Sequence, residues 1–181
     1  MFEYISGHKK ERQNLFIKLL EGRLQVLYKI SYSYFRNKDS ASDAVQDSVL
    51  IAYKNMAKLK DMDKFNSWIT TILVNRCRDI VRKSNKINFE EYDENVLGIS
   101  KYYLKKIDHS FENIETRLDI IKYLQRIDDK YSEVIRLKYL GDYTIEEIAT
   151  IMNIPQGTVK SRLNTGIKKL KGLMEVKRSV V

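Results

Sequence analysis

The chain has 181 residues, 43% of them hydrophobic and 31% charged, which is typical of folded globular proteins. Its single cysteine, Cys77, excludes an internal disulfide and a cysteine-ligated zinc site, and two histidines leave little material for a histidine-ligated metal. The longest apolar run is about five residues, far short of the roughly 18 that a membrane span requires. We therefore expect a soluble intracellular protein that holds no metal or other cofactor.

Charge is distributed unevenly along the chain, whose net charge of +9 favours a polyanionic partner such as nucleic acid. The formal charge is +8 over residues 1–86, −3 over residues 87–112 and +4 over residues 113–181. Helical periodicity fades in the acidic segment, whereas both basic segments repeat apolar residues at spacings of three and four. These patterns predict an all-α fold in which two small helical domains, 1–86 and 113–181, are joined by a flexible linker, 87–112.

The first basic segment predicts three helices, over about residues 12–36, 42–58 and 67–84. The first is expected to break near Gly22, and Ser40 or Ser42 is expected to cap the second. No alternating pattern of convincing length predicts a strand.

The second of these helices has an acidic stripe in an otherwise basic half of the chain. Asp43, Asp47 and Leu50 follow one another at spacings of four and three, opposite the apolar face. Acidic side chains around an exposed leucine suit a protein partner rather than DNA. The plainer interpretation is a solvated helix face.

The third helix has a polar, basic row on its outward face. The row consists of Thr71, Asn75, Arg78 and Arg82, with Arg76 and Lys83 beside it. Cations of this kind can hold a separated DNA strand, and polar pockets or aromatic rings can hold an unstacked base. The nearby aromatic residues Phe65 and Trp68 have helical spacing, which more often marks a core.

The sharpest local signal is a predicted helix-turn-helix in the second basic segment. Thr144 and Glu147 have the spacing of a capping box, and Tyr143 and Ile148 that of a hydrophobic staple. Pro155 suits the first position of the next helix. Helix, short turn and helix is the geometry that places a second helix in the DNA major groove.

The second helix of this pair has the charge expected of a DNA-reading helix. No acidic residue occurs from Ile148 to Met174, and apolar residues from Val159 to Leu170 mark a core-facing side. The plainer interpretation is a basic surface helix that caps a bundle. The residues of this helix that could meet phosphates and base edges are Thr158, Lys160, Ser161, Arg162, Asn164, Thr165 and Lys168.

Several of these segments resemble a known family. Tyr143–Ala149 followed by Gly157–Leu163 resembles the fourth region of bacterial RNA polymerase sigma factors, most closely the extracytoplasmic-function (ECF) group. Asp43–Val49 is similar to the stretch with which that family grips the polymerase clamp. Phe65–Ile69 and Ile72–Asp79 resemble its segment for the promoter −10 element.

The resemblance implies a role for each domain. Residues 1–86 would bind core RNA polymerase and melt the −10 element, and residues 113–181 would read the −35 duplex, so the seven residues of the recognition helix become −35 contacts. A flipped −10 base would be read by Asn75 and the loop Lys60–Asn66. The implied polymerase contacts are Asp43, Gln46, Asp47 and Leu50. The implied −10 contacts are Lys64, Asn75, Arg76, Arg78, Arg82 and Lys83.

The resemblance also implies the partners of the protein, and the sequence shows no sign of an active site. Core polymerase, through its clamp and flap, and promoter DNA would be the working partners, and an anti-sigma factor, often membrane-anchored in this family, would restrain the protein. No catalytic constellation is visible, so we expect a non-enzymatic cytoplasmic protein without a small-molecule substrate. Thr165 departs from many relatives, which have a basic residue there, and Gly166 in the helix interior costs about 1 kcal/mol relative to alanine.

Two other interpretations remain at this point. One is a stand-alone helix-turn-helix regulator that binds an operator as a dimer. The other is a helical interaction protein that binds nucleic acid nonspecifically. Neither assigns a task to the stripe of Asp43 and Asp47, which therefore favours the sigma factor.

Overall fold

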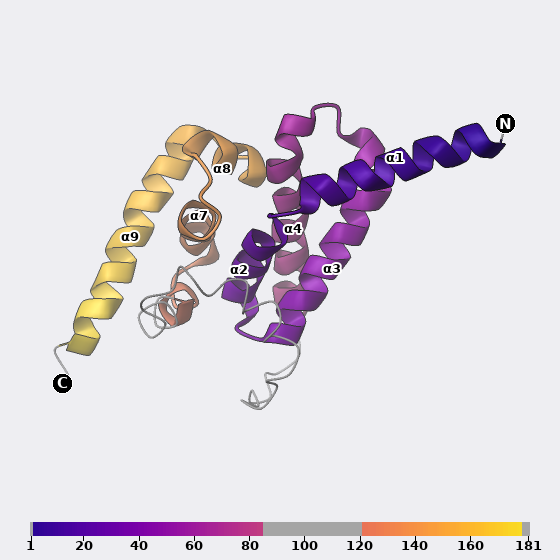
Figure 1. The fold of residues 1–181 in the computed structure, drawn as a ribbon. Helices are drawn as coiled ribbons and strands as arrows, with labels where there is room; N and C mark the ends of the chain where they lie inside the picture. Colours follow the sequence, from indigo (N-terminus) through magenta and orange to yellow (C-terminus); the bar gives the residue numbers. More distant parts are fainter. Residues whose placement is uncertain (1, 85–120, 179–181) are drawn as a thin grey trace.

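The computed structural model describes residues 2–84 and 121–178, and in these ranges every regular element is a helix (Figure 1). This confirms the all-α prediction for the described residues. The predicted linker, 87–112, lies outside them. The front bundle contains α1 (Phe2–Leu20), α2 (Leu24–Phe35), α3 (Lys38–Asn55), the 3-10 turns η1 (Met56–Lys58) and η2 (Met62–Lys64), and α4 (Phe65–Ser84). The rear unit contains α7 (Asp129–Tyr139), α8 (Ile145–Met152) and α9 (Gln156–Arg178).

The helices of the front bundle begin and end close to the predicted places, with two corrections. Helix α1 begins at Phe2, ten residues before the predicted start at about residue 12. The break near Gly22 is confirmed, because Gly22 has φ +77°, a left-handed conformation that glycine adopts without strain. The prediction that Ser40 or Ser42 caps α3 was wrong. Asn37 is the cap, and its side-chain oxygen accepts a hydrogen bond from the backbone N–H of Ser40 at 2.8 Å. Helix α3 therefore begins four residues before the predicted start, and Ser40 supplies the N–H that the cap satisfies.

Helices α2, α3 and α4 enclose the core of the front bundle. Leu27, Ala44 and Leu73 are fully buried, one from each helix. The small Ala44 side chain is suited to a close approach between helices. The ring of Phe65 lies edge-on to that of Phe16, with centroids 5.7 Å apart, so the first residue of α4 is fixed in this core.

The rear unit begins its helix-turn-helix as predicted. The Thr144 amide donates to a Glu147 carboxylate oxygen at 2.7 Å, and the Glu147 amide donates to the Thr144 hydroxyl at 3.2 Å, so the capping box is confirmed. Asn153 ends α8 in the left-handed conformation. Pro155 lies immediately before α9 rather than at its first position, and its carbonyl accepts from the Thr158 amide.

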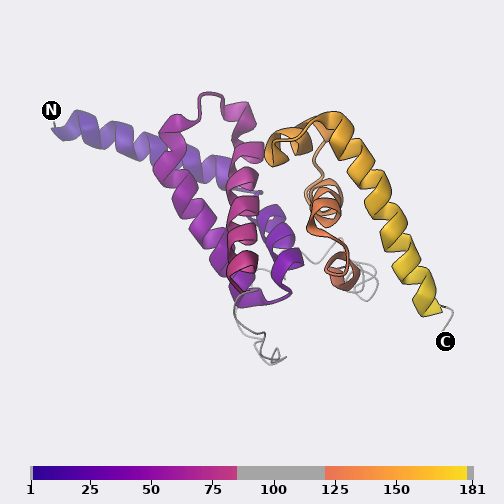
Figure 2. The ribbon, with the colours of Figure 1, turned by 180° about the vertical axis from the view of Figure 1, so that it is seen from behind.

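The two parts pack directly against each other. Helix α4 contacts α8, and α2 contacts α7 (Figures 1 and 2). Residues 132–137 of α7 are all buried, so this stretch of the helix is covered on every side, by the front bundle and by the rest of its own unit. The sequence predicted two domains on a tether and did not predict this contact.

Helix α9 crosses α7 closely at Gly166. A methyl group added there would lie 2.9 Å from the Ile135 Cδ1 atom, 3.2 Å from the Tyr131 Cβ atom and 3.3 Å from the Tyr131 carbonyl oxygen. These distances are shorter than ordinary van der Waals contacts. The glycine that weakens α9 as a helix therefore permits its packing on α7.

We expect Gly166→Ala to lower the melting temperature, although alanine is the better helix former. The gain in helix propensity, about 1 kcal/mol, is outweighed by an overpacking cost of roughly 1–3 kcal/mol. Gly172→Ala in the same helix is the matched control, because a Cβ there meets nothing within 4 Å. It should raise the melting temperature by about 2–4 °C in thermal unfolding followed by circular dichroism. A rise for both variants would contradict the close crossing.

Candidate nucleic-acid interface

The outward row of α4 is defined as Thr71, Asn75, Arg78 and Arg82. Its end at Arg82 is exposed to solvent, whereas Arg78 near its centre is bound by another side chain. Asn75 and Arg82 are exposed. The Arg82 guanidinium donates to the Asp79 carboxylate at 3.0 Å, but both side chains are at least half exposed, so this pair is weak and exchangeable. The Thr71 hydroxyl donates to a carbonyl of its own helix at 2.8 Å.

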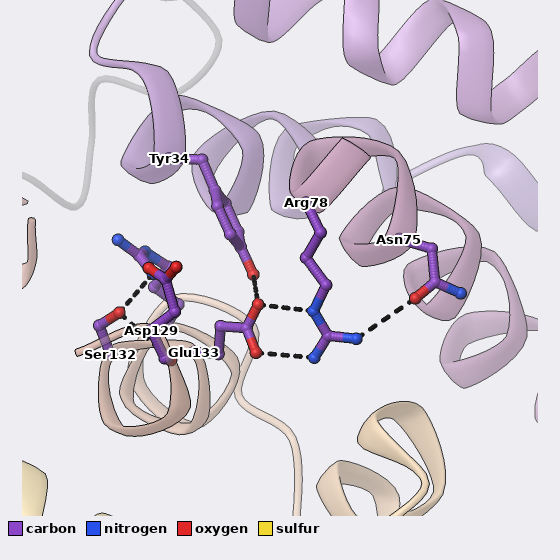
Figure 3. A network of polar contacts seen from close by, with 7 residues as sticks. Tyr34, Asn75, Arg78, Asp129, Ser132 and Glu133 are labelled. Atoms are coloured by element: carbon purple, nitrogen blue, oxygen red, sulfur yellow. Dashed lines mark hydrogen bonds and ion pairs between the residues drawn. The ribbon is translucent and has the colours of Figure 1, made fainter. Parts of the chain in front are cut away.

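Arg78 at the centre of the row is held by Glu133 of α7. The Arg78 Nε and Nη2 atoms donate to the two carboxylate oxygens of Glu133, each at 2.7 Å (Figure 3). Arg78 Nη1 also donates to the Asn75 side-chain oxygen at 3.3 Å. The Glu133 side chain is only 5% exposed, against 38% for Arg78. A predicted DNA contact is thus bound bidentately by a carboxylate of the rear unit.

Neighbouring groups strengthen this contact. The Tyr34 hydroxyl donates to the same Glu133 oxygen at 3.2 Å. Desolvation, followed by the Glu133 charge, raises the pKa of Tyr34 well above its usual value. The hydrogen bond to Glu133 raises the pKa of Arg78, because it favours the charged guanidinium. Arg136 of α7 lies over the Tyr34 ring, 4.4 Å from its centroid.

A second contact between the two parts is made by Tyr143. Its ring is 2% exposed, and its hydroxyl shares a 2.5 Å hydrogen bond with the Thr70 hydroxyl of α4. The same hydroxyl donates to the Asn66 carbonyl at 3.3 Å and accepts from Arg23 at 2.9 Å. Tyr143 was predicted only as a staple for α8, and the structure shows that it also anchors the rear unit to the front bundle.

The acidic stripe of α3, now including Gln46, lies on an exposed face. Asp43 and Gln46 are exposed, and Leu50 is 56% exposed despite its apolar side chain. Asp47 is half-buried and accepts from Arg76 Nε at 2.9 Å and from Nη2 at 2.5 Å. The structure therefore groups Arg76 with the acidic stripe rather than with the outward row of α4.

The recognition helix presents the predicted DNA-contacting residues to solvent. Val159 and Leu163 are buried and fix the helix on its own core, while Arg162 and Thr158 are half-buried. The Ser161 hydroxyl donates to the Thr158 carbonyl at 3.0 Å. The exposed candidates are Lys160, Ser161, Asn164, Thr165 and Lys168.

The remaining candidates lie at the two ends of α4. Lys64 is exposed at the end of η2, with its ammonium 3.6 Å from the Asp61 carboxylate, and Lys83 is exposed in the last turn of α4. Phe65 is a core residue at 1% exposure, and Trp68 is half-buried against the same core.

Glu133 and its surroundings were missed by the sequence analysis. A usable signal was present, because the apolar residues of Tyr131–Leu140 are too many for a single helix face. Such a helix is expected to be covered on more than one side, and an acid within it then needs a buried partner. Only the fold identifies that partner as Arg78.

A helical bundle with a basic row, joined to a capped helix-turn-helix, defines a DNA-binding transcription protein. Two family profiles match the chain: "Sigma-70 region 2" over residues 19–87 and "Sigma-70, region 4" over residues 117–170. The chain belongs to the sigma-70 family of RNA polymerase sigma factors, in the ECF group. It is a sigma factor that directs promoter-specific transcription, and the region 2 match favours this over a stand-alone helix-turn-helix regulator.

Relatives and solved structures agree with this assignment. The chain is 30% identical over 141 residues to the ECF sigma factor EcfG of Rhodopseudomonas palustris, covering 77% of this chain and 74% of EcfG. It is 29% identical over 163 residues to SigV of Bacillus subtilis, covering 90% and 93%. The fold is similar to that of RpoE in complex with the anti-sigma factor NepR from Bartonella quintana, with TM-score 0.70, 23% identity and coverage of 89% and 97%. It is also similar to CnrH in complex with the cytosolic domain of CnrY, with TM-score 0.67, 20% identity and 94% coverage of each chain. Among the described residues, no helix is long and apolar enough to cross a membrane.

Proposed function

We propose that residues 1–86 and 113–181 are the two functional domains of this sigma factor, joined by the linker 87–112. The profile matches over residues 19–87 and 117–170 support these boundaries. In this proposal the front domain binds core polymerase and melts the −10 element, and the rear domain reads the −35 duplex. Core polymerase supplies the catalysis, so the chain itself needs no catalytic residue or cofactor.

The acidic stripe of α3 is the proposed polymerase contact, and its geometry is the observation that carries the proposal. Asp43, Gln46 and Leu50 are exposed on one face, in a half of the chain with a net charge of +8. A carboxylate-rich face around an exposed leucine is unsuited to DNA and suits a basic protein surface with an apolar centre. The polymerase clamp is the partner that the family resemblance implies.

The outward row of α4 and the recognition helix are the proposed promoter contacts. Asn75, with the loop Lys60–Asn66, would read an unstacked −10 base. Arg78 and the neighbouring cations would hold the separated strand, and Arg76, which is paired with Asp47, is the proposed −10 contact closest to the polymerase face. On α9, the exposed residues around Ser161 would meet the −35 major groove.

An anti-sigma factor is the proposed restraining partner. The similar solved structures are of sigma factors bound to NepR and to the cytosolic domain of CnrY. We propose that a protein of this kind covers the promoter-reading surfaces until it is released, and that a membrane-anchored form would hold the chain at the membrane. The chain would otherwise act in the cytoplasm, where core polymerase and DNA are found.

Run-off transcription tests the proposed function directly. Purified bacterial core polymerase would be assayed with and without the chain on a library of genomic promoters. We expect specific start sites only when the chain is present, and their alignment gives both promoter elements. No new start sites, together with a duplex shifted by the chain alone, would instead support an operator-binding regulator.

We expect Asp47→Asn to weaken core polymerase binding by about tenfold, because it removes the central charge of the acidic stripe. Pull-down with immobilised core polymerase measures the loss, and circular dichroism checks the fold. Asp39→Asn is the matched control, since Asp39 is an exposed acid of the same helix outside the stripe. Equal losses for both variants would show that net charge, and not the stripe, matters.

We expect Arg162→Ala to weaken binding to a duplex with the −35 element and to reduce the salt slope by about one. The slope of log affinity against log salt concentration, from fluorescence anisotropy, is the measurement. Lys54→Ala removes the same charge from an exposed site of α3 and should leave the slope unchanged. An unchanged slope for Arg162→Ala would place the phosphate contact elsewhere.

A further inference from the structure

Arg76 joins α4 to the acidic stripe of α3, along two helices that lie side by side (Figures 1 and 2). Its Nε and Nη2 atoms donate to a single carboxylate oxygen, Oδ2 of Asp47, at 2.9 Å and 2.5 Å. Hydrogen bonds between two charged groups are among the strongest in proteins. Two such donors converging on one oxygen fix the orientation of the Asp47 carboxylate.

The direction of Arg76 differs from that of the outward row. At about 100° per residue, position 76 lies roughly 100° from Asn75 and roughly 160° from Arg78 around the helix. A DNA strand that followed the outward row would therefore run along a different side of α4. The neighbour that Arg76 does reach is Asp47, in the middle of the acidic stripe.

Asp47 keeps part of its carboxylate open while Arg76 holds it. Among the described residues, both hydrogen bonds of this carboxylate go to Oδ2, and Oδ1 accepts none. The Asp47 side chain is 42% exposed and, with Asp43 and Gln46, lines an open hollow of about 330 Å³ between α3 and α4. A partner that contacts the stripe can therefore reach Asp47 without displacing Arg76.

We infer that Arg76 is a positioning residue for core polymerase binding, which holds Asp47 in one orientation so that its open oxygen meets the polymerase. This inference rests on the proposed function, in which the acidic stripe is the polymerase contact. It gives Arg76 a task on the protein surface beside the −10 contact proposed for it. A side chain that is already oriented loses less conformational freedom on binding, so the complex lasts longer.

The charge of Arg76 and its hold on Asp47 affect different rate constants. A cation beside the stripe weakens the long-range attraction to a basic partner and so slows association. An oriented Asp47 instead strengthens the formed complex and so slows dissociation. The two effects can therefore be separated by measuring both rates.

Binding kinetics of the full chain on immobilised bacterial core polymerase, followed by biolayer interferometry, test this inference. We expect Arg76→Gln to dissociate about threefold faster than the parent chain, because Asp47 must then be ordered in the complex. Its association should be unchanged or faster, since a cation has been removed from the stripe. Lys18→Gln is the matched control, because it removes the same charge from an exposed position of α1, and it should keep the parental dissociation rate.

The same substitution in an Asp47→Asn chain shows whether Arg76 acts through Asp47. We expect Arg76→Gln to have little further effect on dissociation there, because the charged group that Arg76 orients is gone. Non-additive effects of this kind measure the coupling between two residues.

Circular dichroism and thermal unfolding check each variant, since a structural role alone would lower the melting temperature without changing the dissociation of folded chains. If Arg76→Gln does not fold, Arg76→Lys decides, because it keeps the cation and removes one of the two converging donors. Its dissociation should still be faster than that of the parent chain, and a parental rate would overturn the inference.

The possible outcomes separate this inference from the proposed function. Faster dissociation of Arg76→Gln in the parent chain, but not in the Asp47→Asn chain, supports the positioning role. An unchanged rate, or an equal increase in both chains, overturns it even where run-off transcription succeeds. A parental dissociation rate for Asp47→Asn itself would remove the stripe from the polymerase contact, and the inference with it. Failure of run-off transcription counts against the proposed function, while the rates on core polymerase still report on Arg76.

Discussion

The ion pair between Arg78 and Glu133 determines how the two halves of the described structure lie together. It joins residues 55 positions apart, in a contact that also includes two phenols, a stacked guanidinium and apolar side chains from both parts. A buried carboxylate is tolerated only with a charged, well-oriented partner, so Glu133 requires Arg78 as long as α7 is covered. The position of α7, and of the helix-turn-helix that follows it, depends on this requirement.

Because Glu133 requires a charged partner, Arg78 has a structural role beside the role in DNA binding proposed for it. Arg78 lies in the row that the sequence assigns to DNA, and the fold gives it to a protein carboxylate. Arg76 is in a similar position, since it lies on the helix proposed to contact −10 DNA and is bonded to Asp47 of the acidic stripe. The side chains of Arg78 and Arg76 are 38% and 33% exposed, so both are partly accessible to solvent. The proposed surfaces for DNA and for protein therefore share these two arginines.

Local features of the chain were predictable from the sequence because their causes are local. The break at Gly22, the capping box of Thr144 and Glu147, and the two faces of α9 depend on backbone geometry and helical period. The α3 cap was misassigned because Asn37 and two serines compete for one task, and only the backbone conformation decides among them. The docking of the rear unit could not be predicted, since the pairing of Glu133 with Arg78 is set by tertiary packing.

Helix α7 makes contacts on two opposite sides, and this restricts how the protein could be redesigned. One side supplies Glu133 to the front bundle, and the other supplies Tyr131 and Ile135 to the crossing at Gly166. The tilt of the recognition helix is therefore determined by a helix that is assigned no contact with DNA. A chimera that received only the recognition helix of a relative would combine its side chains with the wrong tilt. Transplanting promoter preference would require α7 and α9 to be exchanged as one unit.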